Sequence, residues 1–287
     1  METHEGKTMK VLVTGGSGRL GQLAIAELLE HRHQVVNTDR RRGPADGPNA
    51  PFVETDLTHV GQVAGLLRDC DALVHLGAIP SPWRHADEVV FTNNVNATYA
   101  VLQAAWITGI QKVVFASSAS AYGMAWSKAS RPPLFVPVDE AHPFLVAEPY
   151  GLSKEVDERI AEMFHRRSGM QIIGLRFHQV VLPSEYAAMD AAGGIDPAGN
   201  PNNLWAYTDG RDAATSIRMA LEVDGLGFEA FNIIAVDTFR IEPTEELLDT
   251  YLPEVERRAP MPGNASLFTI DKAERLLGWS PRHSWRD

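Results

Sequence analysis

Cysteine is almost absent from this chain, which has a single one, Cys70, among its 287 residues. One thiol cannot form an internal disulfide, so the fold must depend on its hydrophobic core, and a reducing cytoplasm fits best. Cys70 precedes Asp71 in an apolar context, and we interpret it as a buried structural thiol.

Long apolar runs are missing as well. No segment approaches the roughly 20 apolar residues that a helix needs to cross a bilayer. The first ten residues, METHEGKTMK, are polar and lack the apolar segment of a signal peptide, which predicts a disordered or cloning-derived extension. Neither export nor membrane insertion is expected.

Positive charge is scarce, because 26 Lys and Arg residues face 37 Asp and Glu residues, for a formal net charge of -11. Nucleic acids and anionic membranes bind basic surfaces, so neither is an expected partner. The one basic run, Arg40 to Arg42, is short. A composition of 44% hydrophobic and 22% charged residues is ordinary for a soluble globular protein.

What the chain does contain is a series of short β-branched runs that alternate with helical patterns. Leucines 20, 23 and 28, for example, recur at helical spacing. Near-continuous apolar strands are typical of a parallel sheet that is covered on both faces. The alternation predicts an α/β fold, a Rossmann-type doubly wound parallel sheet. The expected strands are residues 10–14, 34–39, 50–56, 72–77, 112–118, 172–177 and 230–235.

The regular pattern ends near residue 180. Residues 183–203 are rich in Gly, Pro, Asn and Ala, which predicts a long surface loop or a small lobe. Further on, Asp212 is expected to cap a helix. A last short helix should follow Asp271 as its N-cap and stop at Gly278.

The first strand runs into TGGSGRLG, in which Gly15, Gly18 and Gly21 are spaced three apart. Glycine permits the tight turn, and the missing side chains let a pyrophosphate approach the N-terminal amides of the next helix. A glycine triplet alone is often only a turn, but its place directly after the first strand predicts a dinucleotide site. Arg19 and Leu20 belong to the same expected cofactor contact.

Asp39 ends the second strand, where a carboxylate accepts hydrogen bonds from the adenosine ribose hydroxyls and repels a 2′-phosphate. This favours NAD over NADP. The arginines at 40–42 favour the opposite choice if they pair with a phosphate, but they are equally compatible with a solvated turn.

Three further places agree with one dinucleotide pose. Asp56 can accept from the adenine amino group or act as a helix N-cap, and Leu57 can lie against the ring. After the fourth strand, Leu76, Gly77 and Ala78 offer small or apolar groups where the dinucleotide would cross the sheet.

The chemistry is expected at the carboxyl end of the fifth strand, where ligands of such sheets bind. That strand ends in SSAS, with serines at 117, 118 and 120. On the next helix, Tyr150 stands four residues before Lys154, so a phenol and an ammonium share one side of the helix. A positive charge favours the phenolate, which can then remove a proton from a substrate hydroxyl.

These motifs together resemble an extended short-chain dehydrogenase/reductase of the group called NAD-dependent epimerase/dehydratases. The resemblance implies that Ser118, Tyr150 and Lys154 are catalytic and that Asn93 contacts the cofactor. It also places His178 beside the nicotinamide, although a lone histidine could equally be a core residue. The matching segments are TGGSGRLG, Asp39, Asp56-Leu57, HLGA (75–78), NNVNAT (93–98), SSASAYG (117–123), YGLSK (150–154) and LRF (175–177).

The resemblance further implies an NAD-binding Rossmann domain at residues 9–180, followed at 181–287 by a segment that returns to the sheet and forms a trimmed substrate lobe. A trimmed lobe has less surface for a nucleotide, which favours a small sugar or sugar acid. No metal is required, and no ligand cluster is seen in the sequence. The expected substrate contacts are Ser81, Trp83, Arg84, Ser118, Ser120 and Gln179.

Three functions remain open. The first hypothesis is an NAD-dependent sugar dehydrogenase, and the second is an NAD-retaining nucleotide-sugar epimerase. Ala119 and Ser120 stand where a dehydratase would carry an acidic pair, which argues against dehydration. Uronate oxidisers of the family resemble one another in an arginine past LRF that is absent here, so acid substrates would need Arg84 or Arg211. The third, a non-catalytic NAD sensor, is disfavoured because Ser118, Tyr150 and Lys154 are all present.

Members of this family commonly form homodimers through the two helices that carry NNVNAT and the Tyr-Lys pair. A homodimer is therefore expected here, although the same apolar residues could pack on their own sheet. The candidate residues are Val95, Tyr99, Leu102, Trp106, Val156 and Ile160.

Overall fold

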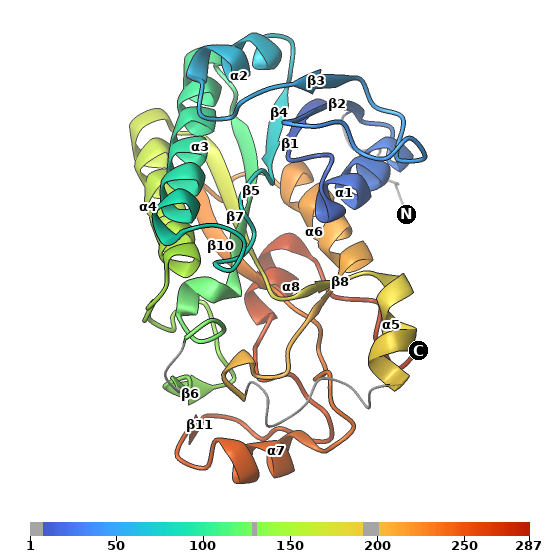
Figure 1. Ribbon diagram of the computed structural model, residues 1–287, viewed down its shortest axis with the longest axis vertical. Coiled ribbons are helices and arrows are strands. Elements are labelled where there is room, and N and C mark those ends of the chain that lie inside the picture. Colours follow the sequence, from blue (N-terminus) through green and yellow to red (C-terminus); the bar gives the residue numbers. More distant parts are fainter. Residues whose placement is uncertain (1–7, 128–130, 192–200) are drawn as a thin grey trace.

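A seven-stranded parallel sheet forms the centre of the protein (Figure 1). The computed structural model describes residues 8–127, 131–191 and 201–287. The strand order is β10-β7-β5-β4-β1-β2-β3, and every neighbouring pair runs parallel. The strands are β1 (Lys10–Thr14), β2 (Gln34–Asp39), β3 (Phe52–Glu54), β4 (Ala72–His75), β5 (Lys112–Ser118), β7 (Gln171–Phe177) and β10 (Phe228–Ile233).

The predicted doubly wound architecture and its seven strands are confirmed, with ends that differ by a few residues in β3, β4 and β10. Helices lie on both faces of the sheet, as right-handed crossovers between parallel strands require (Figure 1). One face carries α2 (Val60–Leu67), α3 (Asp87–Thr108) and α4 (Pro149–Ser168). The other carries α1 (Arg19–Glu30), α6 (Gly210–Glu222) and α8 (Asp271–Leu277).

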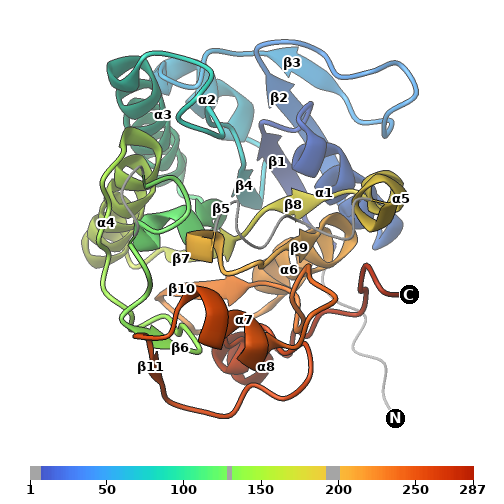
Figure 2. The same cartoon turned by 60° about the horizontal axis from the view of Figure 1, so that its bottom comes forward.

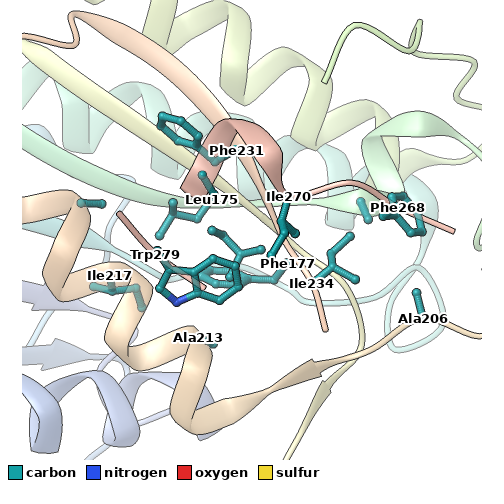
Figure 3. Close-up of a cluster of buried hydrophobic side chains, with 14 of the residues drawn as sticks. Leu175, Phe177, Ala206, Ala213, Ile217, Phe231, Ile234, Phe268, Ile270 and Trp279 are labelled. Carbon is teal, nitrogen blue, oxygen red and sulfur yellow. The ribbon is translucent and has the colours of Figure 1, made fainter. Parts of the chain in front are cut away.

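The sheet separates two hydrophobic cores. Beneath α2, α3 and α4, side chains such as Leu73, Phe115 and Phe164 are fully buried. On the opposite face Trp279, which follows α8, lies between α6 and the strands β7 and β10 (Figure 3). Its indole N–H donates to the Asp212 carbonyl oxygen at 3.0 Å, so this large side chain is buried without an unsatisfied donor.

A small lobe lies beyond the carboxyl ends of β5 and β7. It contains two short sheets, one pairing β6 (Phe135–Val136) with β11 (Glu256–Arg257) and one pairing β8 (Val180–Val181) with β9 (Thr208–Asp209). Figure 2 places α7 (Thr244–Tyr251) beside β6 and β11. The remaining short helices are η1 (Ala119–Tyr122), α5 (Pro183–Ala191) and η2 (Pro201–Asn203).

The segment after residue 180 contributes to both parts of the molecule, because α6 and β10 pack into the main sheet layer and α7 and β11 belong to the lobe. The loop expected at 183–203 begins as helix α5. Residues 192–200 of that segment and residues 1–7 of the expected N-terminal extension lie outside the described residues.

Two predicted helix caps are wrong. The N-cap of α6 is Asp209, whose carboxylate accepts from the Arg211 amide at 2.7 Å. Asp212 lies in the first turn instead, and its carboxylate accepts from the amides of Arg282 and His283. Asp271 is the first residue of α8 rather than its N-cap, whereas Gly278 ends the helix as predicted, with a φ of 66° that suits glycine.

Cys70 is half-buried, and its thiol donates to the Leu66 carbonyl oxygen at 3.3 Å. Burial raises the pKa of this thiol, which keeps it protonated, in line with a structural role. Among the described residues, no helix combines the length and apolar character that crossing a membrane would require.

Candidate active site

The glycine loop between β1 and α1 has a backbone that only glycine allows. Gly15 has a φ of 69°, and a Cβ there would lie 2.6 Å from the Gly77 nitrogen. A Cβ on Gly21 would lie 2.3 Å from the Gly15 carbonyl oxygen. Gly18 is the N-cap of α1 and makes no side-chain cap hydrogen bond, so the first helix amides are not capped by a side chain. This arrangement suits a pyrophosphate.

The other two expected loop residues, Arg19 and Leu20, make separate contacts. Leu20 is partly buried against the hydrophobic core. Arg19 is exposed, and its guanidinium donates to Glu185 of α5 at 2.5 Å and to the Val180 carbonyl oxygen at 3.4 Å. Arg19 therefore links the glycine loop to the chain that follows β7.

Asp39 lies at the end of β2 beside this loop. Its carboxylate accepts from the amides of Ser17 and Arg40 at 3.3 and 2.7 Å. The Arg40 side chain turns back over the site and donates to the Asn93 side-chain oxygen at 3.0 Å. Arg42 lies over the Phe52 ring instead, 5.0 Å from its centroid.

A cavity of about 100 Å³ lies next to Asp39, where an adenosine would be expected. Asp56 lines it, and its carboxylate accepts from the amide and the hydroxyl of Thr58. The Thr58 amide and hydroxyl hold the pKa of Asp56 below its usual value. Asp56 is not the N-cap of α2, which is His59. The other lining residues are Asp39, Arg40, Leu57, Thr58, Gly77, Ala78, Ile79, Asn93 and Ala97.

Leu76, Gly77 and Ala78 follow β4 and cross the glycine loop. The Leu76 amide donates to the Thr14 carbonyl oxygen at 3.0 Å, which extends the β1–β4 pairing by one residue. A cradle this close, next to a carboxylate at the end of β2, fits the diphosphate and ribose of NAD.

Asn94 connects two parts of the candidate site, and the sequence analysis passed over it in favour of its neighbour Asn93. Its side chain is buried, accepts from the Ile79 amide at 2.8 Å and donates to the Ile79 carbonyl oxygen. It also donates to the Ser153 hydroxyl of α4 at 3.2 Å. Asn94 thus ties the loop after β4 to the helix that carries Tyr150. The adjacent asparagines in NNVNAT were the available signal.

The serine-tipped strand β5 and the start of α4 are packed together. Ser118 ends β5, and its hydroxyl accepts from the Ser120 amide at 3.1 Å. On α4, a Cβ at Gly151 would lie 2.6 Å from the Ser120 carbonyl oxygen, so η1 directly abuts the first turn of the helix. Ser118 and Tyr150 therefore lie at one junction.

Helix α4 begins firmly at this junction. The Glu148 carboxylate is the N-cap and accepts from the amides of Tyr150 and Gly151 at 2.7 and 2.6 Å. Pro149 occupies the first helical position, where its missing N–H costs no hydrogen bond. Tyr150 is 9% exposed, so most of its surface is buried at this junction.

Lys154 is buried one turn later on the same helix. Its ammonium lies 6.0 Å from the centroid of the Tyr150 ring and donates to the Ala116 carbonyl oxygen of β5 at 2.8 Å. It also forms an ion pair with Asp157 at 3.2 Å. The structure thus brings the Tyr-Lys pair to the end of β5.

His178 and Gln179 follow β7, which pairs with β5 so that Phe177 lies opposite Ser118. The His178 ring packs 5.6 Å from Phe268, and its Nδ1 accepts from the Gln179 amide at 2.8 Å. Burial lowers the pKa of His178 to about 4, so the ring is neutral near pH 7. Gln179 is exposed at the same edge.

Two tryptophans adjoin this junction, and one of them was not predicted. Trp126 donates through its indole N–H to the Ser120 hydroxyl at 3.0 Å. Trp83, 63% exposed, packs edge-on against Trp126 with ring centroids 6.1 Å apart. Ser81 is half-buried and Arg84 is exposed on the same loop. The two tryptophan rings therefore lie beside Ser120.

One cluster of possible metal ligands went unnoticed in the sequence. Asp209, Asp212 and His283 each present a ligand atom within 4.8 Å of the others. The Asp209 carboxylate accepts hydrogen bonds from Arg211 and Tyr186. The Asp212 carboxylate accepts from two backbone amides and is hydrogen-bonded to the His283 ring. These contacts anchor the end of the chain to α6.

Known proteins resemble this chain in sequence. The model of the NAD dependent epimerase/dehydratase family matches residues 11–233. The protein named "Uncharacterized UDP-glucose epimerase YtcB" of Bacillus subtilis (strain 168) is 26% identical, with 97% of this chain and 95% of that protein covered. UDP-glucose 4-epimerase 2 of Oryza sativa subsp. japonica is 26% identical, with 98% and 80% covered.

Solved structures share the fold. A crystal structure of UDP-galactose 4-epimerase has a TM-score of 0.70 at 26% identity and covers 96% of this chain and 94% of its own. MoeE5 in complex with UDP-glucuronic acid and NAD has a TM-score of 0.72 at 24% identity, with 96% and 95% covered.

Proposed function

The chain belongs to the NAD dependent epimerase/dehydratase family, and from that premise we propose that it oxidises the hydroxyl of a sugar or sugar derivative by hydride transfer to NAD. It is an NAD-dependent enzyme of the extended short-chain type. The observation that carries the proposal is the packing of β5 and α4, which gathers Ser118, Tyr150 and Lys154 at the carboxyl edge of the sheet.

Each of the three residues has one role. NAD, when bound by the glycine loop and Asp39, supplies the hydride acceptor. Ser118 donates a hydrogen bond that orients the substrate oxygen, and Tyr150 removes the proton of that hydroxyl. The Lys154 ammonium favours the phenolate form of Tyr150 by its positive charge. His178, neutral and against Phe268, borders the place expected for the nicotinamide.

A small sugar is preferred over a nucleotide sugar because of the arginines in the C-terminal segment. A diphosphate is commonly held by arginine, and here several guanidiniums are already paired with carboxylates. A nucleotide diphosphate that used one of these arginines would have to displace its carboxylate partner. The pairs are Arg211–Asp209, Arg240–Glu242, Arg257–Glu245, Arg258–Glu256 and Arg286–Asp237.

The second candidate is an NAD-retaining nucleotide-sugar 4-epimerase, which the names of the two relatives above favour. The two functions give different results in one assay. Purified protein is mixed with NAD and, separately, with free sugars, sugar acids and UDP-sugars. NADH accumulation with a free sugar supports the dehydrogenase. Interconversion of UDP-glucose and UDP-galactose without net NADH supports the epimerase instead and overturns the first proposal.

We expect Trp83→Ala to weaken substrate binding without slowing the chemical step. The exposed ring can stack on the apolar face of a sugar, and losing about 1 kcal/mol of such contact raises KM roughly five-fold. Because the contact is made equally in ground and transition states, kcat should not change. Steady-state kinetics measure both constants. Ile241→Ala, another 63% exposed side chain, is the control and should leave KM unchanged. An unchanged KM for Trp83→Ala would remove this residue from the substrate site.

We also propose that the protein is a cytoplasmic homodimer that pairs through α3 and α4. Leu102 cannot take part, because it is fully buried in its own core. Tyr99 is 44% exposed and Trp106 is 36% exposed on the outer face, together with Ile107 and Leu152. We expect sedimentation velocity to give twice the chain mass and Tyr99→Glu to give a monomer. Leu134→Glu, exposed near β6, should leave the dimer intact. A monomeric wild-type protein contradicts the proposal.

A further inference from the structure

Asp157 is a fully buried carboxylate on α4 that the mechanism above does not use. One oxygen, Oδ2, lies 3.2 Å from the Nζ atom of Lys154. Its other oxygen, Oδ1, is also buried and has no hydrogen-bond partner within the described residues. Removing a carboxylate from water is costly, and an unsatisfied oxygen adds to that cost, so a purely structural site would be better served by an apolar side chain.

Within the described part of the chain, Lys154 is the positive group that acts on Asp157. Burial raises the pKa of Asp157, and the charge of Lys154 and then the side chain of Thr98 on α3 oppose that increase. On β4, His75 is hydrogen-bonded to Thr98 and to Thr14 at 3.2 and 2.7 Å. Burial, followed by the charge of Lys154, lowers the pKa of His75 to about 3, so His75 is uncharged near pH 7.

The remaining charges nearby are already compensated. Glu158, the next residue on α4, forms a bidentate ion pair with Arg176 of β7 at 2.9 and 2.8 Å. From β5, the Ala116 carbonyl oxygen accepts from Lys154, and Ser117 donates to Glu158 at 2.6 Å. The charge of Asp157 is therefore directed at Lys154, which in turn faces Tyr150.

We propose that Asp157 is a positioning residue that acts through Lys154. Its carboxylate holds the ammonium group against Ala116 and offsets part of the positive charge that reaches Tyr150. In this way it sets the pH range in which Tyr150 accepts a proton. The inference rests on the proposed roles of Tyr150 and Lys154. It adds a residue that acts through Lys154 and not through the substrate or the dinucleotide loop.

The decisive experiment compares the pH profiles of kcat/KM for the wild-type protein and Asp157→Asn. Without the negative charge, the phenolate of Tyr150 is favoured at lower pH, so the acid limb moves down. Lys154 also loses its counter-ion and gives up its proton at lower pH, so the alkaline limb moves down as well. We expect both limbs to move by about one pH unit in the same direction.

Glu155→Gln is the matched control, because it removes one negative charge from the same helix at a half-buried position. It should leave both limbs in place. A role confined to holding the helix predicts something different, namely a lower kcat at every pH with unmoved limbs, and that result for Asp157→Asn overturns the inference. Thr98→Val keeps the carboxylate but removes the hydroxyl that, with Lys154, opposes the effect of burial on the pKa of Asp157. The carboxylate is then less readily charged, so this variant should give a smaller shift in the same direction even if Asp157→Asn folds poorly.

A second measurement needs no substrate. The ultraviolet phenolate signal of Tyr150 is obtained as the difference between each protein and its Tyr150→Phe counterpart during a pH titration. We expect its midpoint to fall in Asp157→Asn and to stay in place in Glu155→Gln. If Tyr150→Phe retains turnover, the proposed function fails. If Tyr150→Phe is inactive but the Asp157→Asn midpoint does not move, only the role of Asp157 fails.

Discussion

Tyr150→Phe is expected to lower kcat/KM by a factor of about 10² to 10⁴, the usual contribution of a general acid-base group. The substitution removes one hydroxyl from a ring that is 9% exposed and leaves the ring packing in place. The helix start should survive too, because Glu148 caps it through backbone amides and not through the phenol. The loss should therefore lie in the chemical step.

Binding and turnover must be measured separately for this variant. NAD affinity, measured by calorimetry, should stay within a few-fold of wild type, since the glycine loop and the adenosine cavity lie on other elements. Tyr99→Phe, which loses a hydroxyl from an exposed position on α3, is the control and should keep full activity. Substantial turnover by Tyr150→Phe would refute the mechanism.

Arg176→Met is expected to have the largest effect on stability, a decrease of about 3–5 kcal/mol in the free energy of unfolding. The Arg176 guanidinium binds Glu158 through two nitrogens and donates to the Tyr122 hydroxyl at 2.8 Å. All three side chains are buried. Losing the arginine leaves the Glu158 carboxylate buried with only Ser117 as a donor, which is far more costly than losing the pair as a whole.

Urea unfolding, monitored by circular dichroism, tests this expectation together with two further variants. The double variant Arg176→Met/Glu158→Met should recover most of the lost stability, because it removes both charges. Arg257→Met removes a partly exposed arginine that pairs with Glu245 and Asp249, and it should cost about 1 kcal/mol or less. If Arg176→Met and Arg257→Met lowered the free energy of unfolding equally, burial would not determine how much an ion pair contributes to stability here.

The order of local signals along the chain explains why the fold was predictable from one sequence. Each strand of the main sheet is a short apolar run whose hydrophobic pattern is local, so its place in the chain can be found without knowing its neighbours. Gly15 and Gly278 could be placed in the same way, because the local turn at each requires a positive φ that glycine adopts without strain. Caps were less predictable, since Asp209 and Asp212 both fit the start of α6, and distant amides at 282 and 283 decided between them.

The site divides in the same way. Ser118, Tyr150 and Lys154 could be proposed in advance because the Tyr-Lys spacing is local and the order of motifs along the chain resembles a known family. Trp126, Asn94 and Asp157 could not, because their surroundings depend on how separate segments pack. Trp126 meets Trp83, Asn94 joins Ile79 to Ser153, and the packing of α4 buries Asp157 together with Lys154. Nothing in a window of sequence indicates whether an aspartate on a helix faces water or a buried lysine.

By itself, then, the sequence determined the order of strands and helices, the glycine loop after the first strand and the helical spacing of Tyr150 and Lys154, because backbone preferences and short spacings are encoded locally. The tertiary structure decided which charges are buried together. In the folded protein, Arg176 of the LRF motif pairs with Glu158. Asp157 lies against Lys154, and one of its carboxylate oxygens has no hydrogen-bond partner within the described residues. The physical reason is that the energy of a charge depends on its burial and its neighbours, and both are fixed only when the helices pack on the sheet.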